Sequence, residues 1–203
     1  MDNPAALIAV LIPAVFAVTV HEVAHGWVAN RCGDSTAAKQ GRLSLNPLKH
    51  VDPIGTVLVP AALYLSAGVF FGWAKPVPVE WRNLRSPRRD IALVAGAGPG
   101  ANLGMLLGWL VCFHLIKGTG VGTGLLYMCF VGIMFNATIM LINLIPIPPL
   151  DGSRIVTAAL PARAAYLYNR IEPYGLLLLA ALLFTNVLGT LLNPVLQLIK
   201  HLI

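Results

Sequence analysis

The pentapeptide His21-Glu22-Val23-Ala24-His25 has residue types and a spacing that allow chemistry. Two histidines four residues apart on a helix lie about 40° apart around its axis and about 6 Å apart along it. Their imidazoles can therefore share one Zn²⁺ ion. Glu22 adjoins the first histidine and can take a proton from a water on that ion. The spacing predicts a metal-dependent hydrolytic site.

The setting of the motif strengthens this prediction. It follows residues 5–20, which are almost wholly apolar. Placing a charge in such a segment costs at least about 2.5–3.5 kcal/mol on insertion scales, so ionisable residues there indicate function. The alternative is a hydrated helix end, since His21 and His25 fall within the last turns of the apolar segment.

A third ligand is expected, and Asp151 is the best candidate. It follows Pro146, Pro148 and Pro149, which forbid a regular helix and favour an unwound segment at a helix end. Such a segment can direct a carboxylate sideways into a helix bundle. The alternative is that Asp151 caps a short helix over residues 152–160.

The composition indicates the elements that must position these residues. Of 203 residues, 57% are apolar and 11% are charged, which excludes a disordered chain, a nucleic-acid-binding domain and an ordinary cytosolic enzyme. The net charge of +6 fits positive loops that orient a membrane protein. Three cysteines without a C-x-x-C pair make a cysteine metal site unexpected. Five apolar stretches cover residues 5–30, 55–72, 91–116, 122–147 and 174–199.

These stretches predict an all-α polytopic membrane protein with four to six membrane segments. Residues 1–203 form one domain, with a catalytic core over about 5–155 and a C-terminal span over about 174–200. That span is expected as one kinked helix or two half-helices.

The distribution of Lys and Arg predicts the orientation. Twelve of the 14 lie in residues 31–50, 73–90 and 148–173, which places these loops in the cytoplasm and the N-terminus outside. Stretch 55–72 then has positive flanks on both sides, so we expect a re-entrant element. An ordinary span is the alternative.

Three groups of residues resemble the site-2 protease family of intramembrane zinc metalloproteases. They are the histidine motif, Asn143-x-x-Pro146 with Leu150-Asp151-Gly152, and Ala97-Gly98-Pro99-x-x-Asn102. Residues 41–47 and 50–56 are similar to a short prokaryotic branch without a PDZ domain. The resemblance covers roughly residues 5–155.

The resemblance implies that His21, His25 and Asp151 bind one Zn²⁺ per chain and that Glu22 is the catalytic acid and base. The implied activity is that of an endopeptidase acting on transmembrane protein substrates in regulated intramembrane proteolysis, near the cytoplasmic face of a prokaryotic membrane. The partners are that substrate and the lipid bilayer, with no nucleic acid; the oligomeric state stays open. A metal transporter, an inactive substrate-holding relative and a peptidase of soluble peptides are the alternatives.

Other polar and small residues carry weaker expectations. Asn143 and Asn102 are candidate substrate-binding residues, and helix–helix hydrogen bonding is the alternative for each. Segments 41–50 and 75–81 are expected as short strands near the active site that could hold an unwound substrate. A stripe of glycines at every fourth position is expected to pack closely against another span: Gly96, Gly100, Gly104 and Gly108.

Overall fold

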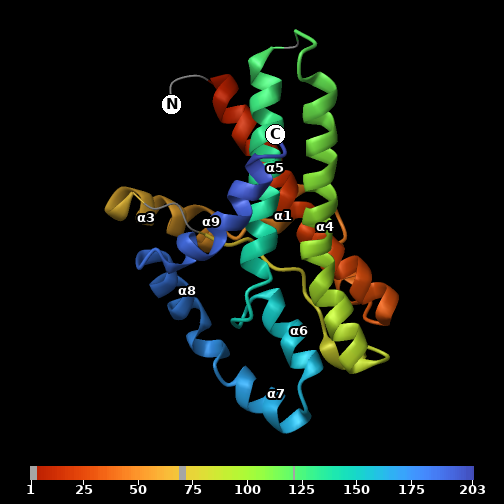
Figure 1. The fold of residues 1–203 in the computed structure, drawn as a ribbon. Coiled ribbons are helices and arrows are strands. Elements are labelled where there is room, and N and C mark those ends of the chain that lie inside the picture. Colours follow the sequence, from red (N-terminus) through yellow and green to blue (C-terminus); the bar gives the residue numbers. More distant parts are fainter. Residues whose placement is uncertain (1–3, 69–71, 121) are drawn as a thin grey trace.

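The computed structural model describes residues 4–68, 72–120 and 122–203. Three long helices, α1, α4 and α5, form its centre, and shorter helices surround them (Figure 1). The α-helices are α1 (Pro4–Cys32), α2 (Thr36–Lys39), α3 (Val59–Ala67), α4 (Pro87–Ile116), α5 (Thr123–Asn143), α6 (Asp151–Ala159), α7 (Ala162–Asn169), α8 (Gly175–Phe184) and α9 (Val187–Lys200). Short 3₁₀ turns cover Pro47–His50, Trp81–Asn83 and Glu172–Tyr174, and a π-helical turn covers Pro53–Leu58.

Helices α1, α4 and α5 are each long and apolar enough to cross a membrane. Helices α8 and α9 lie on either side of a 71° bend and can be counted as a fourth span. Asn186, in the left-handed region at φ 58°, occupies this break. The predicted all-helical fold is therefore confirmed, with three or four candidate membrane spans among the described residues. The expected number of four to six membrane segments is not confirmed, and the last segment is two helices.

The stretch predicted to be re-entrant contains a short apolar helix over Pro53–Ser66. At 1.5 Å per residue it is about 20 Å long, less than the roughly 30 Å of a hydrocarbon core. Helix α3 points across the long helices rather than along them (Figure 1). This helix is thus too short to cross the membrane along its axis, and the re-entrant path of the stretch stays a prediction. Residues 69–71 of this stretch lie outside the described residues.

The described residues contain no β-strand, so the strands expected over 41–50 and 75–81 are not confirmed. Residues 74–80 are extended, but their N–H groups bond to loop carbonyls and side chains instead of to a neighbouring strand. Pro76 and Pro78 also lack the N–H groups that a β-ladder needs.

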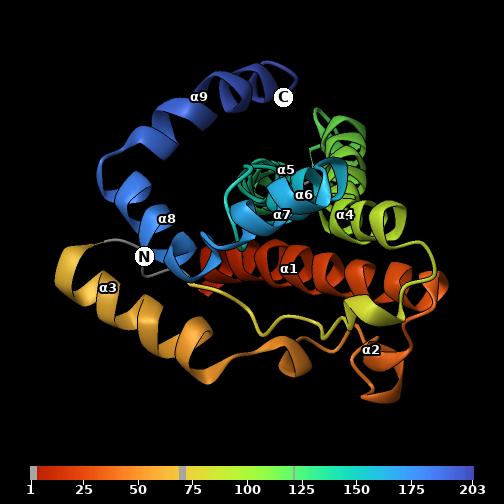
Figure 2. The ribbon, with the colours of Figure 1, turned by 90° about the horizontal axis from the view of Figure 1, so that it is seen from below.

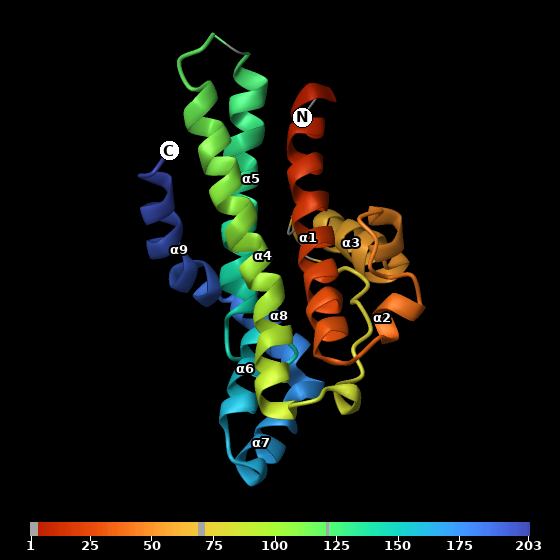
Figure 3. The ribbon, with the colours of Figure 1, turned by 90° about the vertical axis from the view of Figure 1, so that its right-hand side faces the viewer.

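Helix α1 lies between two groups of elements (Figure 2). Helices α4 and α5 pack on one side of it, and α6 packs on α4; on the other side of α1 lie α2, α3 and the extended chain of residues 72–80. Figure 3 shows that the start of α4 and the end of α5 lie toward the same end of the molecule as the C-terminal part of α1. The fold therefore brings residues 21–25 close to the end of α5, where Asp151 follows.

Small buried side chains allow the long helices to approach one another. Ala17 and Ala29 of α1 and Ala137 of α5 have no exposed surface. Large apolar side chains of α1, including Leu7, Ile8 and Leu11, are about half exposed, as expected for a helix that faces lipid. Polar groups of the centre are thus separated from the apolar exterior.

Candidate metal centre

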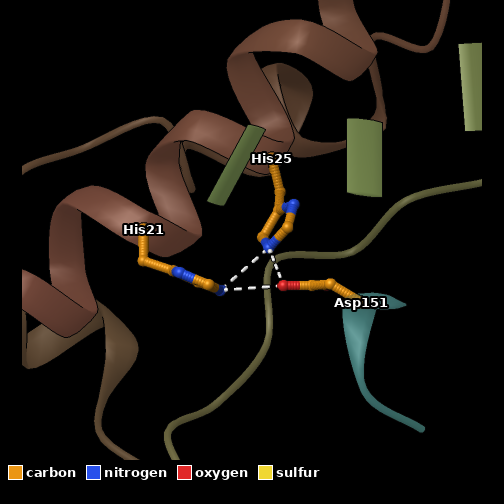
Figure 4. A group of neighbouring side chains, drawn as sticks. All are labelled: His21, His25 and Asp151. Carbon is orange, nitrogen blue, oxygen red and sulfur yellow. Dashed lines mark hydrogen bonds and ion pairs between the residues drawn. The ribbon is translucent and has the colours of Figure 1, made fainter. Parts of the chain in front are cut away.

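Three side chains from two elements meet at the centre of the molecule (Figure 4). His21 and His25 come from consecutive turns of α1, and Asp151 is the first residue of α6. Each offers one ligand atom, and these atoms all lie within 4.8 Å of one another. The His21 and His25 Nε2 atoms are 3.0 Å apart, and each is 3.3 Å from Asp151 Oδ2. The three residues singled out in the sequence are therefore brought together.

Asp151 does not act as the helix cap that the alternative interpretation required. Helix α6 begins at Asp151 itself, with Leu150 as N-cap and no side-chain cap hydrogen bond. The carboxylate faces the histidines instead. Gly152 makes this turn possible, because a Cβ there would lie 2.3 Å from the Leu144 carbonyl oxygen.

The outer nitrogens of both imidazoles are held by hydrogen bonds. His21 Nδ1 lies 2.5 Å from Asn102 Oδ1, and His25 Nδ1 lies 2.7 Å from the Val94 carbonyl oxygen. A carbonyl oxygen only accepts, so both Nδ1 atoms carry the proton. Both Nε2 atoms then direct a lone pair toward Asp151, which is the tautomer that a metal ligand needs.

This arrangement fits a bound cation. Two nitrogen lone pairs and a carboxylate oxygen face one another, and Asp151 Oδ2 is buried without a hydrogen-bond donor. Ligands about 2.0–2.1 Å from a tetrahedral Zn²⁺ stand roughly 3.3 Å apart, close to the separations found here. Two histidines and a carboxylate also form a known catalytic zinc set that keeps a fourth position open.

Gly98 of α4 closes one side of the histidine pair. A Cβ at this position would lie 2.4 Å from His25 Nε2 and 2.6 Å from His21 Nε2. The four glycines of the predicted stripe behave differently, since a Cβ at Gly96, Gly100, Gly104 or Gly108 would meet nothing within 4 Å. The expectation that this stripe packs against another span of the chain was wrong; the close approach is at Gly98.

Glu22 lies on a different side of α1 and contacts the extended chain. Its Oε2 accepts a hydrogen bond of 2.8 Å from the Val77 backbone N–H. The N–H groups of Trp73 and Lys75 donate to the carbonyls of Gly55 and His50 at 3.0 and 2.9 Å. Residues 73, 75 and 77 thus fasten this segment to the loops and to Glu22.

Asp34 fastens the far end of the same segment. Its buried carboxylate accepts hydrogen bonds from the Glu80 N–H at 2.8 Å and from Asn83 Nδ2 at 2.9 Å. Thr36 donates through both its N–H and its hydroxyl. Burial opposes ionisation of Asp34, but these donors outweigh it and hold the pKa of the carboxyl below its ordinary value.

An apolar cavity of about 310 Å³ adjoins the extended chain. Its wall combines residues 11–19 of α1 with the loop at His50, the turn at Gly55, and Trp73 and Ala74. Thr19 is two residues from His21, and Ala74 is three residues from Val77. The cavity therefore shares one wall, residues 72–74, with the extended segment that contacts Glu22 farther along the chain.

The two candidate substrate-binding asparagines have different environments. Asn102 is fully buried, and its Nδ2 contacts Asn136 Oδ1 at 2.9 Å and the Ala17 carbonyl at 3.4 Å. Its polar atoms are thus occupied within the helix bundle, which favours the helix–helix alternative. Asn143 is half-buried and donates to the Ile139 carbonyl of its own helix at 3.1 Å.

Comparison with known proteins agrees with this geometry. The model of peptidase family M50 matches residues 106–186. A Bacillus subtilis (strain 168) protein named "Putative zinc metalloprotease YwhC" is 39% identical over 195 residues, which cover 92% of this chain and 85% of that protein. A Mycolicibacterium smegmatis protein named "Putative zinc metalloprotease Rip2" is 29% identical over 183 residues, covering 86% and 66%. No solved structure matches the chain. The chain belongs to peptidase family M50, the site-2 protease family.

Proposed function

We propose that the protein is an intramembrane zinc endopeptidase that hydrolyses peptide bonds of transmembrane proteins near the cytoplasmic membrane face. The observation that carries this proposal is the convergence of His21, His25 and Asp151 on one point, with both imidazoles held in the tautomer that binds metal. The zinc metalloprotease names of the relatives support the choice of zinc.

His21, His25 and Asp151 would hold one Zn²⁺ per chain. When bound, zinc lowers the pKa of a water to about 7 and polarises the substrate carbonyl. Glu22 takes a proton from the water that attacks the peptide carbonyl and returns it to the leaving amine. The Val77 N–H orients the Glu22 carboxylate for this transfer, because it engages one of the two oxygens.

The substrate would bind on the side of α1 that carries Glu22. A transmembrane helix must unwind before its carbonyl can react, and the unwound segment can lie beside the extended residues 72–80, which contact Glu22 through Val77. The apolar cavity beside Ala74 accommodates one of its apolar side chains. Asn143, at the end of α5, is a further candidate contact to the substrate backbone.

The orientation proposed for the membrane places the N-terminus outside and residues 31–50, 73–90 and 148–173 in the cytoplasm. Helix ends that border these three loops lie toward one end of the molecule (Figure 3). The bacterial relatives support a prokaryotic cytoplasmic membrane. Single cysteines in each loop should react with an impermeant reagent only from the cytoplasmic side; labelling of residues 82–89 from outside would contradict the orientation.

The alternative of a metal transporter is less well supported. A transporter needs successive metal sites across the membrane, whereas one group of three or more metal-binding side chains occurs in the described part of the chain. An inactive relative is expected to have lost a ligand or the glutamate, and all four residues are present.

The test is cleavage of a single-span substrate by the purified protein and by Glu22→Gln. Gln keeps the size and the hydrogen bond to Val77 but cannot take a proton. We expect cleavage to fall by about 100-fold to 10,000-fold, the usual contribution of general acid–base catalysis, while bound zinc stays at about one per chain. Asp151→Ala should instead lose the zinc. Normal cleavage by Glu22→Gln would refute the proposal.

A further inference from the structure

Two buried carboxamides connect three helices behind His21. Asn102 of α4 and Asn136 of α5 are both fully buried. Asn136 Nδ2 donates to the Gly132 carbonyl at 2.8 Å, and Asn136 Oδ1 accepts from Asn102 Nδ2 at 2.9 Å. Asn102 Oδ1 lies 2.5 Å from His21 Nδ1. No role for Asn136 was predicted from the sequence.

The direction of this chain of hydrogen bonds is fixed at one end. The Gly132 carbonyl can only accept, so the amide group of Asn136 must face it. The Asn136 Oδ1 oxygen then faces Asn102, so Asn102 must direct its Nδ2 donor toward that oxygen. The remaining group of Asn102 is its oxygen, and this oxygen requires a proton on His21 Nδ1.

We propose that Asn136 is a positioning residue that, through Asn102, keeps the proton of neutral His21 on Nδ1 and the Nε2 lone pair free for the metal. The inference rests on the metal site proposed above. In this proposal Asn136 and Asn102 together keep the proton of His21 on Nδ1, as the Val94 carbonyl does for His25. Partners of metal-bound histidines commonly act in this way, and their loss typically weakens metal affinity about 10-fold to 100-fold.

A structural role for Asn136 is the competing explanation, because buried asparagines also join membrane helices. Two substitutions separate the roles. Asn136→Leu fills a similar volume but removes the acceptor that lies 2.9 Å from the Asn102 amide, which leaves only the Ala17 carbonyl at 3.4 Å. Asn136→Asp, protonated in this buried place, can donate to Gly132 and accept from Asn102 and so restores the relay.

The measurement is zinc affinity of the purified full-length protein by competition with a chelator of known affinity. We expect Asn136→Leu to bind zinc about 10-fold to 100-fold more weakly, and Asn136→Asp to stay within a few-fold of the unmodified protein. The matched control is Thr138→Val on the same helix, whose hydroxyl bonds only to the Met134 carbonyl at 2.8 Å; its affinity should not change. Unchanged affinity in Asn136→Leu, or an equal loss in Asn136→Asp, would overturn the inference.

A second measurement needs no substitution at Asn136. Nitrogen NMR of ¹⁵N-histidine-labelled, metal-free protein, with His21 assigned by comparison with a His21→Gln variant, reports which ring nitrogen carries the proton. Protonated Nδ1 is expected, and a predominant Nε2–H form would refute the relay. If the unmodified protein bound no zinc, the proposed function would fail; if it bound zinc but Asn136→Leu bound it equally well, only the relay would fail.

Discussion

The two sides of α1 are built differently. On the side of α4 and α5, the partners of His21 and His25 are buried groups, Asn102 and the Val94 carbonyl. On the side of the extended chain, the partner of Glu22 is the backbone N–H of Val77, in a segment fastened to the loops by further backbone hydrogen bonds. Figure 2 shows α1 between these two surroundings.

This difference matches the tasks proposed for the two sides. A metal site requires its ligands within a few tenths of an ångström, and rigid helices with fully bonded side chains provide that. A protease must also admit a polypeptide, and a segment held through its main-chain N–H groups leaves side chains available to contact that polypeptide. Substitutions beside the metal ligands should therefore change zinc binding and cleavage together. Substitutions in the extended chain should leave zinc bound and change cleavage or stability.

The largest effect is expected from Gly98→Ala on the metal side. The new methyl group would lie 2.4 Å from His25 Nε2 and 2.6 Å from His21 Nε2, so the imidazoles must move. We expect zinc to be lost and cleavage to fall by about 100-fold or more, since a displacement of about 1 Å in an active site costs that much. Metal analysis and a cleavage assay on the same preparation test this.

Gly100→Ala is the matched control for that substitution. It lies in the same helix two residues later, and its methyl group would meet nothing within 4 Å. It should keep both zinc and cleavage. Full zinc occupancy in Gly98→Ala would mean that the histidines do not have the positions found here.

A smaller and different effect is expected from Val77→Pro on the substrate side. Proline removes the N–H that orients Glu22 but allows extended backbone. A hydrogen bond to a charged group contributes roughly 1.5–3 kcal/mol, and we expect an effect at the lower end of this range, a fall in cleavage of about tenfold. Zinc content should not change, because among the described residues the Val77 N–H bonds to Glu22 and not to His21, His25 or Asp151.

Val77→Ala controls for the lost side chain, because it keeps the N–H. It should retain most of the cleavage that Val77→Pro loses. If both variants lost cleavage equally, the isopropyl group and not the hydrogen bond would be the important feature. If Val77→Pro lost zinc, metal binding would depend on the substrate side of α1 as well as on the metal side.

The metal side could largely be predicted from the sequence. Histidine and glutamate beside an apolar run are costly, so their presence at His21, Glu22 and His25 is informative. Asp151 was predicted from the three prolines that precede it. The same rule would have identified Asn136, a carboxamide within the apolar residues 125–142.

The substrate side could not be predicted in the same detail. Its hydrogen bonds start from main-chain N–H groups, which every residue except proline possesses, so no residue type identifies Val77 as the partner of Glu22. The glycines show a related difficulty. A regular spacing suggested Gly96, Gly100, Gly104 and Gly108, whereas the close approach at Gly98 depends on where the histidine rings lie in space.

The smallest effect on cleavage is expected from Asp34→Asn, which acts on the substrate side through stability. Asp34 is fully buried and accepts hydrogen bonds from Thr36, Glu80 and Asn83. Asn retains one acceptor oxygen and turns a donor toward some of these donors, a change that costs about 1–3 kcal/mol in a buried site. We expect a Tm lower by several degrees at pH 7, with zinc content unchanged and cleavage near that of the unmodified protein at a temperature well below both midpoints.

The charge state of Asp34 determines how this Tm difference should change with pH. Because the donors hold the pKa of Asp34 below its ordinary value of about 3.9, ionised Asp34 stabilises the folded protein above that pH, and this contribution is lost as the pH falls through the lower pKa of the folded state. The Tm difference between the unmodified protein and Asp34→Asn should therefore be constant from pH 7 to about 5 and shrink on further acidification. Thermal unfolding in detergent between pH 7 and 3 measures it. A difference that stayed constant to pH 3 would show that the charge of Asp34 does not hold the extended chain in place.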